Sequence, residues 1–178
     1  MCALALGLGC GKKQAPSGQD AEPIPFASVK EVRLPAPPEQ AASYLGIPAG
    51  ATDVALTKIG AEILLIQVFD MYCMNCQREA PDVNALYERV QGSDLAKRVR
   101  FLGIGKGNTQ TEVRIYHERY KVPFPLFADP NKKAVNQMGI DRTPTFVIVD
   151  LKRQRVLHEQ WRLESAESMF ERLRKAGG

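Results

Sequence analysis

The chain has 178 residues, of which 44% are hydrophobic and 25% are charged. This size suits one globular domain with a modest extension, and the composition excludes a collagen-like or wholly disordered chain. The formal net charge is only +4 and aromatic residues make up 7%, so nothing points to a nucleic-acid partner. The four cysteines fall into two settings, with Cys2 and Cys10 near the N-terminus and Cys73 and Cys76 as an isolated C-x-x-C.

The N-terminal residues contain a short apolar run that stops at Cys10. The run is far shorter than the about 20 apolar residues of a membrane-spanning helix. It resembles the end of a bacterial lipoprotein signal, in which the cysteine is lipidated and becomes the mature N-terminus. We therefore expect residues 1–10 to be a signal and lipobox remnant, with lipidation at Cys10 and a start codon further upstream. An ordinary cleaved signal and an unstructured leader are the alternatives.

Residues 11–50 are expected to form a tether and N-terminal extension. Seven of the 12 prolines and six of the 14 glycines lie in the first 50 residues. Residues 11–30 are polar and contain proline, so we expect them to bury too little apolar area to offset the entropy of the chain. The packed domain is therefore predicted to cover residues 51–178.

After residue 50 the pattern alternates between strands and helices. The apolar run at 63–69 has the length of a strand that is covered on both faces. The other predicted strands cover residues 99–104, 124–127, 145–149 and 155–161. The predicted helices cover residues 77–91 and 109–120, and two more begin at Asp129-Pro130 and at Ser165. This order predicts an α/β protein with a mixed sheet and helices on both faces.

The C-x-x-C pair lies between the first predicted strand and the helix that follows it. A cysteine at a helix N-terminus has its thiolate stabilised by unpaired backbone N–H groups and by the helix dipole, which lower its pKa. The two-residue spacing lets the second sulfur reach the first. We therefore expect Cys73 to be the attacking thiolate and Cys76 to resolve the mixed disulfide, so that the two form a redox disulfide.

Two other interpretations of this pair are weaker. A zinc site needs four ligands, and only His117 and His158 remain, without a partner motif. A purely structural disulfide of this spacing closes too small a loop to constrain the chain much. We expect no metal and no cofactor.

The glycine-rich segment 103–108 matches neither the G-x-G-x-x-G pattern nor the Walker pattern of phosphate-binding loops, and it is predicted to be a plain strand-to-helix turn.

Residues 51–176 resemble a thioredoxin-fold protein of the TlpA/ResA type, within the redoxin group. The stretch from Cys73 to Pro81 matches the C-x-x-C-x-x-E-x-P pattern of that family, and residues 139–146 resemble the segment that contains its cis-proline. Residues 124–129 are also similar to the family. The resemblance implies a thioredoxin-like three-layer α/β/α fold with a mixed central sheet.

The resemblance also implies roles for individual residues. Glu79 would be an acid–base and specificity group near the thiols, although it is also an ordinary acidic residue for a first helical turn. Pro144 would be a cis-proline that shapes the substrate site and frees the backbone of Thr143 to pair with an extended substrate. The remaining residues expected to contact substrate are Tyr72, Met74 and Asn75. Tyr72 stands where the family usually has tryptophan, and Met74-Asn75 lacks the usual proline or histidine.

The leading hypothesis is a monomeric thiol–disulfide oxidoreductase of the cell envelope, held at the membrane by an N-terminal lipid anchor. By resemblance, a DsbD- or CcdA-like membrane reductant would supply electrons, and exported proteins with cysteine pairs, such as apocytochromes c, would be the substrates. A reducing direction rests on analogy alone. One alternative is a peroxiredoxin-like peroxidase with antioxidant activity, although no P-x-x-x-T-x-x-C loop precedes Cys73. The other is a copper-binding module that uses both thiols with Met71 or Met74 as ligands.

Overall fold

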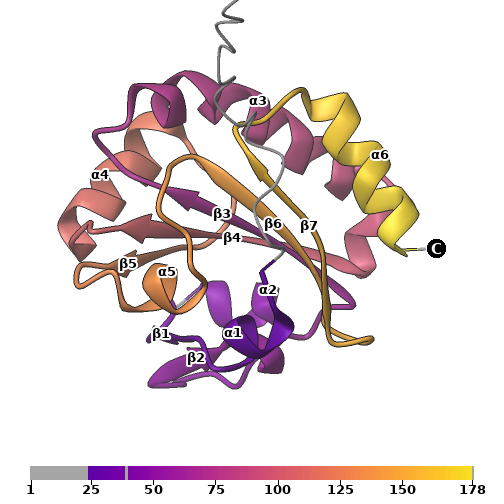
Figure 1. The fold of residues 1–178 in the computed structure, drawn as a ribbon, viewed down its shortest axis with the longest axis horizontal. Helices are drawn as coiled ribbons and strands as arrows, with labels where there is room; N and C mark the ends of the chain where they lie inside the picture. The colour runs from indigo at the N-terminus through magenta and orange to yellow at the C-terminus, as the bar shows by residue number, and fades with distance from the viewer. Residues whose placement is uncertain (1–23, 39, 178) are drawn as a thin grey trace, which may run out of the picture.

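The computed structural model describes residues 24–38 and 40–177. A five-stranded sheet with the strand order β5-β4-β3-β6-β7 lies between two layers of helices (Figure 1). Its strands are β3 (Ile63–Phe69), β4 (Val99–Lys106), β5 (Leu126–Asp129), β6 (Thr145–Asp150) and β7 (Arg155–Trp161). The pairs β3–β4 and β4–β5 are parallel, whereas β3–β6 and β6–β7 are antiparallel. The predicted mixed sheet is therefore confirmed.

The central strand β3 is buried along its whole length because both faces of the sheet are covered. On one face, Ile63, Leu65 and Phe69 pack against residues of α3 (Met74–Gln91), α4 (Gln110–Tyr120) and α6 (Ala166–Gly177). On the other face, Leu64, Ile66 and Val68 form a second core. The uninterrupted apolar run of β3 is what a two-sided position requires.

The second face is covered largely by residues 24–50. This segment forms α1 (Phe26–Lys30), β1 (Arg33–Pro35) and α2 (Ala41–Leu45), and β1 pairs with β2 (Asp53–Ala55), which precedes the short 3-10 helix η1 (Leu56–Lys58). Val29, Val32 and Leu45 are fully buried against the sheet, together with α5 (Lys133–Gln137). Figure 1 shows α1, α2 and α5 on the side of the sheet opposite α3 and α6.

This packing corrects the domain boundary that we drew at residue 51. The core includes residues from Ile24 onward, so residues 24–50 are part of the domain and not a tether. The interpretation of residues 11–30 as too polar to bury apolar area is wrong for 24–30, because Val29 is fully buried. Residues 1–23, with the expected signal remnant and Cys10, lie outside the described residues.

The start of α5 also differs from the prediction. Asp129 is the last residue of β5, and α5 begins only at Lys133. The buried Asp129 carboxylate accepts a hydrogen bond from the backbone N–H of Val135, in the first turn of α5, at 3.0 Å, so it satisfies an amide at the start of the helix although Lys132 is the N-cap residue. Ala134 and Val135 are buried, as expected from the apolar spacing.

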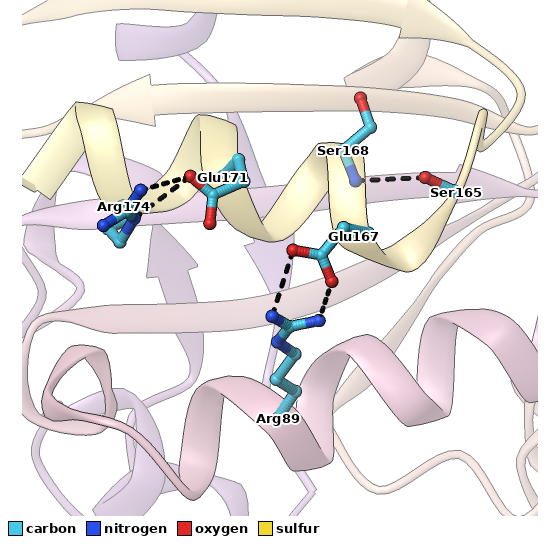
Figure 2. A network of polar contacts seen from close by, with 6 residues as sticks. All are labelled: Arg89, Ser165, Glu167, Ser168, Glu171 and Arg174. Carbon is cyan, nitrogen blue, oxygen red and sulfur yellow. Dashed lines mark hydrogen bonds and ion pairs between the residues drawn. The ribbon is translucent and has the colours of Figure 1, made fainter.

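The last helix, α6, packs against α3. As predicted, Ser165 caps it: its Oγ accepts a hydrogen bond from the backbone N–H of Ser168 at 3.0 Å (Figure 2). Figure 2 also shows Arg89 of α3 bound through both terminal nitrogens to the carboxylate of Glu167. The short 3-10 helix η2 (Asp94–Lys97) follows α3 and leads into β4. Thus α3, which begins at the C-x-x-C pair, packs against both the sheet and α6.

Candidate active site

Cys73 is the N-cap residue of α3. The chain leaves β3 at Phe69, and the backbone of Cys73 is extended, with φ −73° and ψ 113°, before the helix begins at Met74. The Cys73 Sγ accepts a hydrogen bond from the backbone N–H of Cys76 at 3.3 Å. The predicted placement of Cys73 at a helix N-terminus is therefore confirmed, and its sulfur takes the position of a capping oxygen.

The two thiols have opposite environments. Cys73 is half-buried and Cys76 is fully buried, and both are free thiols. Partial burial alone would raise the pKa of Cys73, but hydrogen bonds from Cys76, from the Thr143 side chain and from backbone N–H groups outweigh it and lower that pKa. Burial raises the pKa of Cys76, and its hydrogen bond to Cys73 raises it further. The more accessible Cys73 sulfur is thus the better nucleophile at neutral pH.

The loop before β6 reaches the Cys73 sulfur from the other side. The Thr143–Pro144 peptide bond is cis, as predicted. The carbonyl oxygen of Thr143 lies 3.5 Å from the Cys73 Sγ and accepts a hydrogen bond from its thiol form. The structure therefore brings Cys73 together with Thr143 and Pro144, which lie about 70 positions away in the sequence.

Glu79 lies one helical turn after Cys76 and is only 6% exposed. Its Oε1 accepts a hydrogen bond from Arg162 Nε at 2.9 Å, and its Oε2 accepts one from the backbone N–H of Leu163 at 2.9 Å. The carboxylate thus faces the turn between β7 and α6. Both oxygens already have a partner in this reduced state.

Tyr72 and Met74 are exposed beside Cys73 and form the rim of the site with the half-buried Asn75. The side chains of Tyr72 and Met74 are 66% and 77% exposed, which is unusual for large apolar residues. The Tyr72 hydroxyl donates a hydrogen bond to Glu112 Oε1 on α4 at 2.7 Å, so the ring is fixed by its polar end. Asn75 accepts a hydrogen bond from Arg78.

Asn108 holds the loop that precedes Cys73, and the sequence interpretation missed it. Its Oδ1 accepts a hydrogen bond from the backbone N–H of Met71 at 2.9 Å, and its Nδ2 donates one to Asp70 Oδ1 at 3.1 Å. The side chain is almost completely buried. Segment 103–108 is only partly the predicted strand-to-helix turn, because β4 continues to Lys106; Gly107, with φ +72°, then turns the chain so that Asn108 reaches the active-site loop.

A protein-family model matches residues 37–157, more than half of the chain, and its description is the AhpC/TSA family. The chain belongs to the AhpC/TSA family. The resemblance to redoxins that the C-x-x-C and cis-proline segments indicated is therefore confirmed.

Curated relatives of this AhpC/TSA protein bear the name thiol-disulfide oxidoreductase ResA. The sequence from Geobacillus thermodenitrificans is 26% identical over 95 residues, which is 53% of this chain and 52% of that protein. The sequence from Halalkalibacterium halodurans is 21% identical over 112 residues, or 63% and 61% of the two chains. The chain thus spans about half to three fifths of the length of these relatives.

Solved structures establish the fold of this AhpC/TSA protein as thioredoxin-like. StoA from Bacillus subtilis matches with a TM-score of 0.57 at 18% identity, over 68% of this chain and 89% of StoA. A putative thioredoxin from Neisseria meningitidis matches with a TM-score of 0.60 at 19% identity, over 71% and 81% of the two chains. The predicted thioredoxin-like α/β/α architecture is confirmed.

Residues 24–38 and 40–177 contain neither a cluster suited to a metal ion nor a membrane-spanning helix. No group of three or more histidine, cysteine, aspartate or glutamate side chains in this part of the chain is placed to hold a metal ion. No helix of these residues is long and apolar enough to cross a membrane.

Proposed function

We propose that the protein is a thiol–disulfide oxidoreductase that exchanges electrons with protein disulfides or dithiols. The difference between its two thiols supports this proposal. Cys73 is accessible and has a lowered pKa, whereas Cys76 is buried and has a raised pKa. A reactive thiolate beside a protected thiol is the arrangement that disulfide exchange through a mixed disulfide requires.

In the reducing direction, the Cys73 thiolate attacks one sulfur of a substrate disulfide. A bond forms between Cys73 and that sulfur, and the other substrate sulfur leaves as a thiolate and takes a proton from water. The Cys76 sulfur then attacks Cys73, losing its proton, and releases the second substrate thiolate. Two electrons pass to the substrate, and Cys73 and Cys76 end as a disulfide.

Glu79 is the candidate acceptor for the proton of Cys76. A carboxylate has about four acceptor positions, and the hydrogen bonds from Arg162 and Leu163 occupy two of them. The helical spacing between Cys76 and Glu79 places both on neighbouring turns of α3. We assign the proton-accepting role to Glu79 as part of this proposal.

We assign substrate binding to the rim of the site. Tyr72 and Met74 offer exposed apolar surface next to Cys73, with Asn75 beside them. The backbone around Thr143 and Pro144 would pair with an extended substrate segment that presents its disulfide to Cys73.

The setting of the reaction is also part of the proposal. We propose a monomer in the cell envelope, attached to the membrane through a lipid on Cys10 and reduced by a DsbD- or CcdA-like membrane protein. Exported proteins with cysteine pairs, including apocytochromes c, are the proposed substrates. Support comes from the relatives named thiol-disulfide oxidoreductase ResA. Intact mass of the protein extracted from bacterial membranes, before and after Cys10→Ser, would test the anchor.

The decisive experiment measures reduction of a model protein disulfide by the wild-type protein and two variants. Cys73→Ser should abolish reduction, and Cys76→Ser should accumulate a mixed disulfide that mass spectrometry detects. Full reduction by Cys73→Ser would show that the nucleophile is wrongly assigned. A rapid reaction with hydrogen peroxide would instead favour the peroxidase, and tight Cu(I) binding without disulfide turnover would favour the copper-binding module.

The equilibrium potential of the Cys73–Cys76 pair against glutathione would decide the direction of electron flow. A value near that of thioredoxin, roughly −270 mV, indicates a reductant, and a value near roughly −120 mV indicates an oxidant.

A further inference from the structure

We propose that Arg162 is a positioning residue of this active site: it joins the cis-proline loop to Glu79 and keeps the buried Glu79 carboxylate neutralised beside the dithiol. This inference rests on the proposed oxidoreductase function and adds to it a residue that no motif indicates. Arg162 lies directly after β7, more than 80 positions from Glu79 in the sequence.

Three hydrogen bonds support the assignment. The backbone N–H of Arg162 donates to the carbonyl oxygen of Pro144 at 3.0 Å. The Arg162 Nε donates to Glu79 Oε1 at 2.9 Å, and the N–H of the next residue, Leu163, donates to Glu79 Oε2 at 2.9 Å. One short turn thus contacts both the loop that approaches Cys73 and the helix that contains Cys76.

The backbone of Arg162 is held in a conformation that few side chains adopt. Its φ is +67°, in the left-handed region that favours glycine. A non-glycine residue there costs free energy that the surrounding contacts must offset. Arginine at this position is able to offset it through its bond to Glu79.

The charges explain why Glu79 needs this partner. The Glu79 carboxylate is almost completely buried, whereas the Arg162 side chain is 45% exposed and keeps contact with solvent. A buried carboxylate without a compensating cation is strongly destabilising. An ion pair with one solvated member neutralises the carboxylate while it desolvates the cation only in part.

The Arg162–Glu79 ion pair is connected to the two thiols in two ways, through α3 and through the cis-proline loop. Along α3, Glu79 follows Cys76 by one helical turn. Across the loop, Pro144 follows Thr143, whose carbonyl oxygen is 3.5 Å from the Cys73 Sγ. The buried Tyr116 hydroxyl donates to the Cys76 carbonyl at 2.9 Å, and burial, followed by the charges of Cys76, Tyr120, Cys73 and Glu79, raises the pKa of Tyr116, so these groups share one low-dielectric region.

The other charged groups around this region have partners of their own. Asp70 accepts hydrogen bonds from the Tyr72 N–H and from Asn108, and Glu112 binds Tyr72 and Thr109. Arg142 lies over the Trp161 ring and pairs with Asp141. Arg162 is therefore the described cation in contact with Glu79, and its removal leaves a negative charge that disfavours a second one at Cys73.

The test measures the alkylation rate of Cys73 by iodoacetamide as a function of pH. Arg162→Met removes the charge and keeps an unbranched apolar side chain. It should move the midpoint of the profile to higher pH by about half a unit to one unit. Arg162→Lys should restore part of the shift. Arg142→Met is the matched control, because it removes a similarly exposed arginine from the same region without touching Glu79, and it should leave the midpoint unchanged.

Glu79→Gln tests the effect of the Glu79 charge on Cys73 without removing Arg162. Alone, this substitution should move the midpoint of the Cys73 alkylation profile to lower pH. Combined with Arg162→Met, it should cancel the upward shift that Arg162→Met causes. This variant keeps the inference testable if Arg162→Met fails to fold. A midpoint that Arg162→Met and Glu79→Gln leave at the wild-type value overturns the inference. Because alkylation needs no substrate disulfide, that result is distinct from a failure of the wild-type protein to reduce disulfides, which overturns the proposed function.

Discussion

The two hydrogen bonds between Asn108 and the loop before Cys73 should contribute measurably to the free energy of unfolding. Asn108→Ala removes a hydrogen bond to the Asp70 carboxylate and leaves the part-buried N–H of Met71 without its acceptor. Losing these bonds and leaving one donor unpaired should cost about 2 kcal/mol. For a domain of this size, that cost should lower the midpoint of thermal unfolding by about 4–8 °C.

The measurement is thermal unfolding of the reduced protein, followed by circular dichroism. Asn131→Ala is the matched control, since Asn131 is exposed and its truncation should leave the midpoint almost unchanged. The same variants should differ in Cys73 alkylation, because Asn108→Ala no longer fixes Met71 and Asp70, which lie two and three residues before the thiol. If Asn108→Ala behaves like Asn131→Ala in both measurements, the two hydrogen bonds do not restrain the loop and the reasoning is wrong.

Two further predictions concern the core and the pH dependence. Gly103→Ala should destabilise the protein by about 1–3 kcal/mol in urea unfolding, because its Cβ would lie 2.3 Å from Leu126 Cδ2, whereas Gly92→Ala, whose Cβ has no contact closer than 3.4 Å, should cost little. Between pH 9 and 10, the free energy of unfolding of the reduced wild-type protein should fall by about 1 kcal/mol relative to Cys76→Ser, because the unfolded state ionises Cys76 above its ordinary pKa of 9.0 while the folded state keeps it protonated. Cys73, whose pKa is shifted in the opposite direction, is present in both proteins and does not affect the difference between them; an equal pH dependence in the wild type and in Cys76→Ser would contradict this explanation.

The parts of the fold that the sequence predicts well are those with strong local signals. The apolar run of β3, the helical spacing of α3 and the serine cap of α6 each depend on neighbouring residues, and each prediction is confirmed. The cis bond before Pro144 was also predictable, but from family resemblance and not from local chemistry.

The missed features depend on contacts between distant segments. Asn108 and Arg162 are ordinary polar residues in short turns, and only the folded chain brings them to Met71 and to Glu79. The packing of residues 24–50 had an indirect signal. A strand that is apolar on both faces needs a layer of side chains packed on each face of the sheet. The helix after Asp129 is too short to cover the second face alone, so another segment has to pack there.

The strand order has a consequence for the order in which the protein is made. The central strand β3 pairs with β4 on one side and with β6 on the other, and Val68 meets Thr145 only when most of the chain has been synthesised. Cys73 and Cys76 therefore leave the ribosome long before Thr143 and the last helix are available to surround them. Until that segment completes the sheet, the contact between Cys73 and Thr143 and part of the cover over Cys76 cannot form, so the full difference between the two thiols arises late in folding.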